Sequence, residues 1–300
     1  MRRGDFAAAW EISDAVLRSR AGISCRHLPR HMQYVWDGTS LEAKRVLIRC
    51  YHGLGDTIQF IRYAPLVKAI AAQVIVSAPA ELIALLQMMD GIDRLFPLDA
   101  AEPSYDVDVE VMELPHVFRT TIQTIPAQIP YFHVDAASLP RDRQLAVGIV
   151  WEAGDWDLRR SIPYSLIAPL AEIRGIELYV LQHGPGLAKR NDGLGMVLSS
   201  DNLFETARRL RALDLLITVD TMAAHLAGAL GVRVWTLLHA DADWRWLEQR
   251  RDSPWYPTMR LFRQERSGKW APVIAAVSSE LDLARFSSAR RSGKAQAYSV

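Results

Sequence analysis

The amino-acid sequence predicts an α/β protein with two parallel-sheet domains joined by a linker. Strand-like and helix-like segments alternate along the chain twice, first over residues 45–111 and again over residues 146–238. Three prolines, Pro126, Pro130 and Pro140, fall in the linker that separates the two runs. Such alternation is typical of parallel sheets with helices on both faces. We therefore expect a cleft lined by the carboxyl ends of the strands, where open α/β sheets bind ligands.

Composition excludes several other classes of protein. The chain has 300 residues, of which 50% are hydrophobic, and no stretch approaches the ~20 apolar residues of a membrane span. The net charge of +1 gives no overall field that attracts nucleic acid or anionic lipid. The two cysteines, Cys25 and Cys50, lack the spacing of a metal site and are expected to be reduced. These features predict a soluble, cytoplasmic protein that does not bind nucleic acid.

The first run begins with a strand over residues 45–51, after an amphipathic helix over residues 4–20 and an irregular connector. A helix with a possible kink at Pro65 follows the strand. The next elements are predicted as a strand at 73–77, a helix at 80–89 and a strand near 95–98. Valines alternate with acidic residues over 105–111, a pattern that predicts a half-exposed edge strand.

The second run alternates four strands with helices. The predicted strands are 146–151, 176–182, 215–219 and 232–238, and the predicted helices are 164–174, 203–213 and 222–230. The stretch from residue 285 is rich in small and basic residues and is expected to be disordered. The predicted divisions are a helical remnant with connector (1–44), a first domain with linker (45–140), a second domain (141–284) and a tail (285–300).

Gly53-Leu-Gly-Asp56 lies at a predicted strand-to-helix turn. Gly53 and Gly55 allow close approach of the backbone to a ligand. Asp56 is a candidate general base that accepts the proton of a substrate hydroxyl. An N-cap aspartate would suit the same helix equally well, so both interpretations stay open.

Asp220-Thr-Met-Ala-Ala-His225 follows a second apolar strand and opens a helix of small residues. Thr221 suits the N-cap, and free amides at Met222, Ala223 and Ala224 would form an anion site for a diphosphate. His225 would reach a phosphate or ribose oxygen. A buried core histidine is the competing interpretation.

Three further strand ends carry weaker candidates. Trp151 opens a loop with Arg159 and Arg160, and a guanidinium there suits a phosphate. Gln182 begins a glycine-containing loop that would contact a base or ribose. His239, Asp241 and Asp243 form only a weak metal pattern, and no metal site is predicted.

Four blocks of sequence together resemble glycosyltransferase family 9, and in particular its tetratricopeptide-associated branch. The blocks are residues 53–66, 160–163, 214–231 and 243–263, in the family's order. Gly4-Asp-Phe-Ala-Ala-Ala-Trp10 also looks like one helix of a tetratricopeptide motif, although the repeat does not recur.

The resemblance implies a GT-B-like architecture of two facing Rossmann-like domains. It implies an inverting, metal-independent transfer of a sugar from a nucleotide diphosphate donor, which is a substrate, so that no cofactor is needed. Asp56 matches the position of the family's general base. Asp220, Thr221 and His225 match the nucleotide- and phosphate-binding pattern, and Arg160 falls near a basic residue for the diphosphate.

The resulting expectation is a transferase that uses an ADP-heptose-like donor and a hydroxyl acceptor on a glycan or lipopolysaccharide-type molecule. Any membrane contact would be peripheral and made through the acceptor. The principal alternative is a catalytically inactive nucleotide-binding or scaffold protein derived from a tetratricopeptide-linked transferase. A nucleotide-sugar epimerase or hydrolase is disfavoured because the chain has no dinucleotide-binding loop or Tyr-x-x-x-Lys pair.

Overall fold

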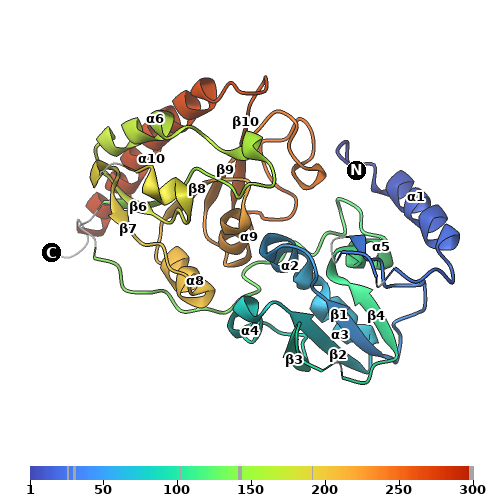
Figure 1. Ribbon diagram of the computed structural model, residues 1–300. Helices are drawn as coiled ribbons and strands as arrows, with labels where there is room; N and C mark the ends of the chain where they lie inside the picture. The colour runs from blue at the N-terminus through green and yellow to red at the C-terminus, as the bar shows by residue number, and fades with distance from the viewer. Residues whose placement is uncertain (26, 30–31, 102, 141–143, 191, 297–300) are drawn as a thin grey trace. The chain divides into compact units, whose positions relative to one another are not determined.

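The chain forms two compact α/β units (Figure 1). This computed structural model describes residues 1–296 apart from 26, 30–31, 102, 141–143 and 191. Unit 1 comprises Met1–Val134 and Asp243–Pro257, and unit 2 comprises Asp135–Ala242 and Thr258–Val300. The sequence-based division differs because it places residues 243–257 in the second domain. Its boundary at residues 140–141 falls beside residues that the structure does not describe.

Unit 1 is built on a four-stranded parallel sheet. Its strands are β1 (Arg45–Arg49), β2 (Gln73–Ala78), β3 (Arg94–Pro97) and β4 (Val107–Glu110), in the order β3-β2-β1-β4. The central strand β1 is buried on both faces, which explains its continuous apolar run. The predicted edge strand is β4, and it pairs with β1 in parallel, with Arg49 opposite Glu110.

The helices of unit 1 follow the predicted order with shorter elements. They are α1 (Phe6–Ser19), α2 (Leu54–Phe60), α3 (Ala64–Ile70), α4 (Ala80–Leu86) and α5 (Leu114–Val117), with 3₁₀ turns η2 (Ile61–Tyr63) and η3 (Val111–Glu113). The predicted kinked helix is broken at η2, so that Pro65 stands in the first turn of α3. A proline there loses no helical hydrogen bond.

Helix α1 packs against the body of unit 1. Phe6 and Trp10 are buried, and the Trp10 indole N–H donates to the Thr120 carbonyl (2.7 Å). Asp14 pairs with Nε2 of His116 (2.8 Å) and with Arg119 (2.8 Å). The hydrogen bond from Arg119, followed by that from His116, lowers the pKa of Asp14 to about 2.

The segment 243–257 returns from unit 2 to unit 1 and is anchored there by aromatic packing. Trp246, Trp255 and Tyr256 are fully buried. Arg62 donates to the Trp255 carbonyl and lies 4.4 Å from the centre of the Tyr256 ring. These aromatic side chains therefore pack within unit 1 and fix the position of the segment there.

Unit 2 holds a six-stranded sheet in which every pairing is parallel. Its strands are β5 (Leu145–Val150), β6 (Ile176–Val180), β7 (Met196–Val197), β8 (Leu215–Val219), β9 (Val234–Leu238) and β10 (Met259–Arg263), in the order β10-β9-β8-β5-β6-β7. Strands β7 and β10 were not predicted from the sequence. Strand β10 follows the segment 243–257 of unit 1 and not a helix, so the strand–helix alternation of the sequence does not indicate it.

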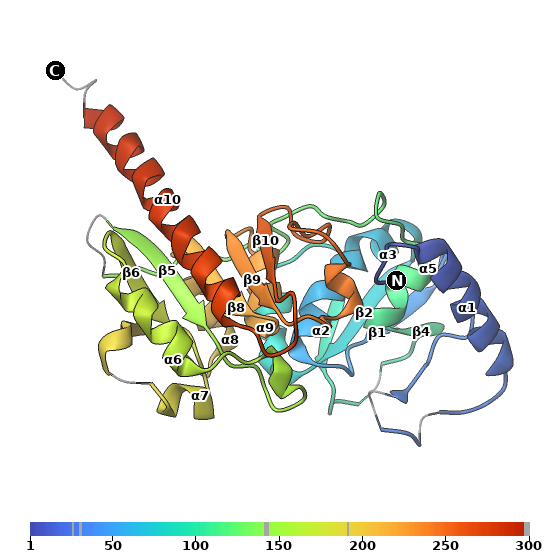
Figure 2. The same ribbon diagram turned by 90° about the horizontal axis from the view of Figure 1, so that it is seen from above.

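Helices enclose this sheet. They are α6 (Tyr164–Ile167), α7 (Pro185–Ala188), α8 (Leu203–Arg211), α9 (Met222–Ala229) and α10 (Ala271–Gln296), with 3₁₀ turns η4 (Leu158–Arg160), η5 (Ala168–Glu172) and η6 (Asp192–Leu194). Figure 2 shows α6 beside α10. Residues of both helices share one hydrophobic core with alternate residues of the strands. Helices α8 and α9 contact each other, and α9 packs on β8 and β9.

Helix α10 extends to Gln296, whereas the sequence analysis expected disorder from residue 285. The expectation is therefore wrong for residues 285–296, and residues 297–300 lie outside the described part of the chain. Among the described residues, no helix has the length and apolar character needed to cross a membrane.

Each sheet has a point where the strand order reverses. In unit 1 this point lies between β1 and β4, and in unit 2 it lies between β5 and β8. Ligands of open α/β sheets bind outside the carboxyl ends of the strands at such a point. The loops after these four strands are therefore where a site is expected in each unit.

Candidate functional site

In unit 1, Asp56 lies in the first turn of α2, directly after β1. Its Oδ2 accepts a hydrogen bond from the Gly53 amide (3.2 Å), and Gly53 is the N-cap. Gly55 is the second residue of the helix. Asp56 is thus not the N-cap residue that the competing interpretation expects, but its carboxylate accepts a hydrogen bond from the N-cap amide at the start of the helix.

The other oxygen of Asp56 receives a charged partner from the return segment. Arg245, in the 3₁₀ turn η7 (Trp244–Trp246), donates from Nη2 to Oδ1 of Asp56. The Arg245 side chain is 12% exposed and also pairs with Asp243 (3.0 Å). Its guanidinium carbon lies 5.3 Å from the centre of the Phe60 ring. The carboxylate of Asp56 is therefore held in one orientation from two sides.

A second carboxyl group lies at the same switch point. Glu110 ends β4, is 1% exposed, and accepts at Oε2 from the Met112 amide (2.7 Å). His52 Nε2 is 3.6 Å from the same oxygen. Burial, followed by the charges of Glu113 and Asp56, raises the pKa of Glu110 well above its usual range.

In unit 2, α9 begins after β8, and Thr221 is its N-cap as predicted. The Ala223 amide donates to Thr221 Oγ1 (3.3 Å), and the Ala224 amide donates to the Thr221 carbonyl (3.1 Å). The expectation of three free amides is therefore wrong for these two, because the cap itself uses them. Met222, whose side chain is half-buried, opens the helix.

Arg160 and His225 converge on Asp220. Arg160 Nη1 donates to the Asp220 carbonyl (3.1 Å), and His225 Nε2 is 4.0 Å from Asp220 Oδ1. The side chains of His225 and Asp220 are 7% and 10% exposed. The structure thus brings Arg160, from the loop after β5, to Asp220 and His225 at the start of α9.

Two other residues that the sequence suggests for contact with the nucleotide-sugar donor, Gln182 and Trp151, have structural roles. Gln182 Oε1 accepts from the amides of Trp151 (3.0 Å) and Glu152 (2.9 Å). Its Nε2 donates to the carbonyls of Glu152 (3.1 Å) and His183 (2.9 Å). All the hydrogen-bonding groups of the side-chain amide are therefore used within the protein, where they connect the loops after β5 and β6.

Trp151 is 1% exposed and belongs to the hydrophobic core, where it packs on Tyr164 with ring centres 5.7 Å apart. The structure therefore gives this side chain a packing role. The large apolar ring is more stable in the core than at a strand end facing solvent.

Three residues near the candidate sites were not predicted from the sequence, namely Arg245, Glu110 and Asp157. Arg245 stands in a block quoted for the family resemblance, but no local pattern indicates its partner. The alternating pattern over residues 105–111 predicts Glu110 on the exposed face of a strand, but its side chain is buried. Asp157 binds Arg159 through both carboxylate oxygens (2.9 Å each), which lowers the pKa of Asp157 to about 2.

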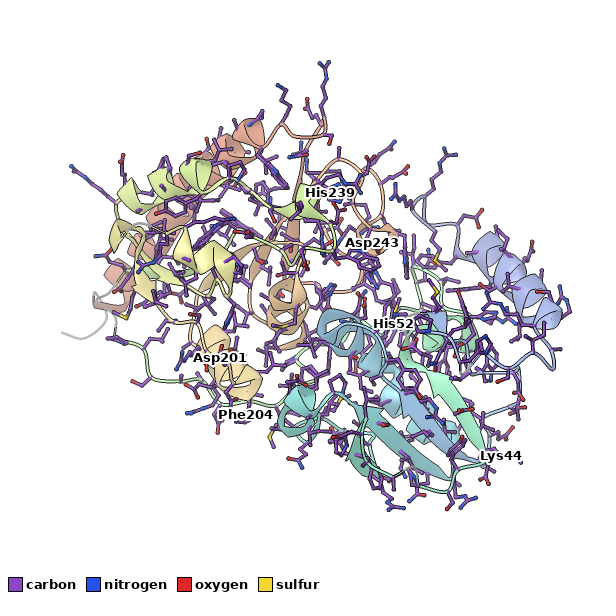
Figure 3. All side chains as sticks on the ribbon, in the orientation of Figure 1. Lys44, His52, Asp201, Phe204, His239 and Asp243 are labelled. Atoms are coloured by element: carbon purple, nitrogen blue, oxygen red, sulfur yellow. The ribbon has the colours of Figure 1, made fainter. Side chains whose placement is uncertain are left out.

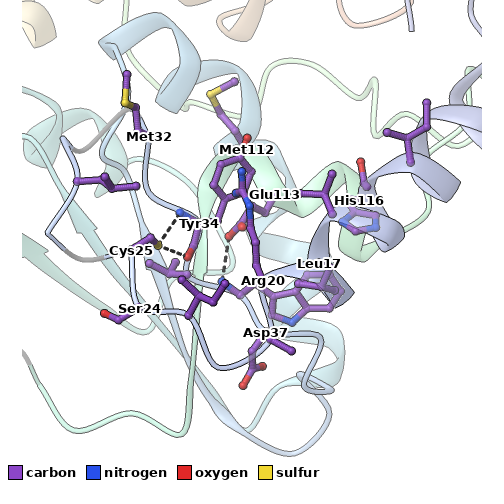
Figure 4. Close-up of a pocket in the computed structure, with 18 of the residues that line it drawn as sticks. Leu17, Arg20, Ser24, Cys25, Met32, Tyr34, Asp37, Met112, Glu113 and His116 are labelled. Atoms are coloured by element: carbon purple, nitrogen blue, oxygen red, sulfur yellow. Dashed lines mark hydrogen bonds between the residues drawn. The ribbon is translucent and has the colours of Figure 1, made fainter.

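Unit 1 also contains a cavity of about 730 Å³ between α1, the connector that follows it, and η3 (Figure 4). Arg20 lies over the Tyr34 ring, and Cys25 donates to the Tyr34 carbonyl. Glu113 lies at the cavity and accepts from the Trp36 amide (3.3 Å). Within the described ranges, no group of three or more His, Cys, Asp or Glu side chains is arranged to hold a metal ion.

Three solved structures that share this fold are of sugar transferases. The chain matches E. coli ADP-heptose lipopolysaccharide heptosyltransferase II with a TM-score of 0.57 at 12% identity, over 81% of this chain and 99% of the other. It matches a glycosyltransferase family 9 protein of Veillonella parvula with a TM-score of 0.56 at 11% identity, over 75% and 87%. For E. coli heptosyltransferase WaaC with ADP-2-deoxy-2-fluoro heptose, the TM-score is 0.52 at 16% identity, over 79% and 99%. The chain therefore has the GT-B-like α/β fold of these transferases.

Among curated proteins, the chain is similar to protein FlbA of Caulobacter vibrioides, at 25% identity over 291 residues. The match covers 82% of this chain and 48% of FlbA, so the chain spans about half the length of this relative. No protein-family model matches the chain.

Proposed function

We propose that the protein is an inverting glycosyltransferase that moves a sugar from a nucleotide diphosphate donor to an acceptor hydroxyl. The observation that carries this proposal is the position of the candidate residues at the switch points of a fold shared with sugar transferases. Arg160, Asp220 and His225 meet at the start of α9 in unit 2, and Asp56 stands beside β1 in unit 1. An ADP-heptose-like donor is favoured because the WaaC structure holds ADP-2-deoxy-2-fluoro heptose.

In the proposed reaction, Asp56 accepts the proton of the acceptor hydroxyl as that oxygen attacks the anomeric carbon. The new bond forms as the bond from this carbon to the diphosphate oxygen breaks, and the electron pair leaves with the nucleoside diphosphate. Arg160, His225 and the amide of Met222 stabilise the departing charge. No metal or cofactor is required in this scheme.

Asp56 retains the capacity for this role although both its oxygens have partners. A carboxylate offers about four lone-pair sites, and Arg245 and Gly53 take one on each oxygen. The fixed orientation reduces the entropy lost when an acceptor hydroxyl binds.

We further propose a cytoplasmic protein of the tetratricopeptide-associated branch, acting on a hydroxyl of a glycan or lipopolysaccharide-type acceptor. Support for the branch comes from the single helix α1 and its motif. Support for the compartment comes from Cys25 and Cys50, which are free thiols.

The test combines binding and turnover. Calorimetry with ADP, ADP-heptose, ADP-glucose and UDP-N-acetylglucosamine identifies the donor. Release of nucleoside diphosphate is then followed with water and with lipopolysaccharide core oligosaccharide as acceptors. We expect Asp56→Asn to keep the donor affinity and to lower turnover by about 10²–10⁴-fold. Asp90→Asn, at a carboxylate 93% exposed in the same unit, is the control.

Turnover at the wild-type rate in Asp56→Asn would remove Asp56 from the mechanism. Donor binding by the wild type without turnover on either acceptor would favour the inactive nucleotide-binding protein instead.

A further inference from the structure

His239 follows β9, next to the strand that leads into α9, and no role has yet been assigned to it (Figure 3). Its imidazole is 5% exposed. The charged groups that influence the pKa of His239 are Asp157, Arg159 and Arg160 from the loop after β5, and Asp241 from its own loop. A histidine is thus enclosed by charged side chains of two loops at the donor edge of unit 2.

None of these groups forms a hydrogen bond with the imidazole ring. The nearest, Asp157 Oδ2, is 3.8 Å from His239 Nε2, which is beyond hydrogen-bond distance. Asp157 instead accepts from the Arg159 amide (3.0 Å), Nε (2.9 Å) and Nη2 (2.9 Å). Among the residues that the structure describes, His239 therefore has an ion-pair neighbour but no hydrogen-bond partner for its ring.

Burial also favours the neutral form of the imidazole. Burial lowers the pKa of His239, and the charge of Asp157 only partly opposes this effect. A neutral imidazole carries one N–H donor and one acceptor nitrogen. A hydroxyl group matches this pair because it also donates and accepts, whereas a phosphate would favour a cationic partner such as Arg160.

His239 is connected to the residues assigned above to the diphosphate. Arg160, which acts on His239, donates to the Asp220 carbonyl one residue before the N-cap of α9. Arg245, which holds Asp56, follows His239 by only six residues along the chain, whereas it follows Gln182, just after β6, by 63 residues. The end of β9 therefore leads directly into the segment that holds Asp56, and the end of β6 does not.

We propose that His239 binds a hydroxyl group of the transferred sugar and selects the donor by it, with the Asp157–Arg159 pair as its neighbouring support. The inference rests on the proposed function, since it assigns part of the nucleotide-sugar site. It divides the site into a charged part for the diphosphate and a neutral part for the sugar.

The experiment compares a sugar nucleotide with its nucleoside diphosphate. Calorimetry is carried out with ADP-heptose and ADP on the wild type, His239→Ala and His239→Gln, and with ADP-glucose and UDP-N-acetylglucosamine as further donors. In His239→Ala we expect the affinity for the bound sugar nucleotide to fall by about tenfold and the affinity for the nucleoside diphosphate to change by less than about twofold. His239→Gln, which keeps a donor and an acceptor, is expected to recover part of the loss.

His133→Ala, which removes an imidazole that is 61% exposed in unit 1, is the matched control. If His239→Ala unfolds, the same comparison is made with His239→Gln, and the donor-induced shift of the His239 ring resonance is measured in the wild type. An equal loss for sugar nucleotide and nucleoside diphosphate would assign His239 to the ribose and overturn the proposal, as would no loss for either. Failure of the wild type to bind any of the sugar nucleotides would overturn the proposed function as well.

Discussion

Arg245 donates a hydrogen bond to Oδ1 of Asp56, a residue 189 positions earlier in the chain. The bond joins the turn after β1 to the segment that returns from unit 2, and both residues belong to unit 1. The candidate base is thus oriented by the part of the chain that follows β9. This arrangement makes Arg245 a positioning residue in the proposed reaction.

We expect Arg245→Met to lower turnover by about tenfold or more and to destabilise unit 1 by about 1–3 kcal/mol. Methionine keeps packing volume against Phe60 but leaves Asp56 without its charged partner. Nucleoside diphosphate release and urea unfolding measure the two effects. The control is Arg250→Met, because Arg250 lies on the same segment and pairs with Asp252 at a more exposed place. Equal effects of the two substitutions would contradict the positioning role.

Gln182 is expected to contribute stability rather than ligand contact. Gln182→Ala removes hydrogen bonds to two amides and two carbonyls and should destabilise unit 2 by about 2–3 kcal/mol. Gln182→Glu keeps the acceptor but places a carboxylate oxygen against the carbonyls of Glu152 and His183, so it should also destabilise. Chemical denaturation at pH 7 tests this, with exposed Gln144→Ala as control. Unchanged stability together with a lost donor affinity would restore the ligand role.

Glu113 gives unit 1 a pH dependence of known sign. Burial raises the pKa of Glu113 from 4.5 to about 7. Between these values the folded protein binds more protons than the unfolded protein, so the free energy of unfolding falls as pH rises. The contribution is fully present below about pH 4.5 and is lost as pH passes about 7.

Glu113→Gln should remove this contribution, because glutamine accepts from the Trp36 and Glu110 amides without ionising. We expect the difference in free energy of unfolding between variant and wild type to shift in favour of the variant by about 1–3 kcal/mol from pH 4.5 to pH 8. Denaturation curves at both pH values measure it, and exposed Glu42→Gln serves as control. Parallel pH curves for Glu113→Gln and the wild type would refute the assignment.

Much of the fold follows from local sequence patterns. The apolar run of β1 and the alternation in β4 predict a buried central strand and an edge strand, and both are found in those positions. Thr221 predicts the N-cap of α9 because a hydroxyl before a run of small helix formers satisfies an end amide. Such features depend on residues within a few positions of one another.

The candidate site was only partly predictable for the same reason. Asp56 follows a strand of unit 1, whereas Arg160, Asp220 and His225 follow strands of unit 2, and within each parallel sheet the strand ends lie at one edge. Their actual partners are not local. Gln182 looks like a ligand residue until its four hydrogen bonds are known, and Glu110, which alternates with valines in the sequence, is buried in the structure.

The sequence by itself determined the α/β alternation, the turn at Gly53–Asp56 and the capped start of α9, because backbone propensity and hydrophobic period act over short distances. Only the tertiary structure decided that residues 243–257 rejoin unit 1, that Arg245 holds Asp56, and that His239 is buried without a hydrogen bond among the described residues. Burial and ion pairing depend on residues far apart in the chain, and chain folding alone brings them together.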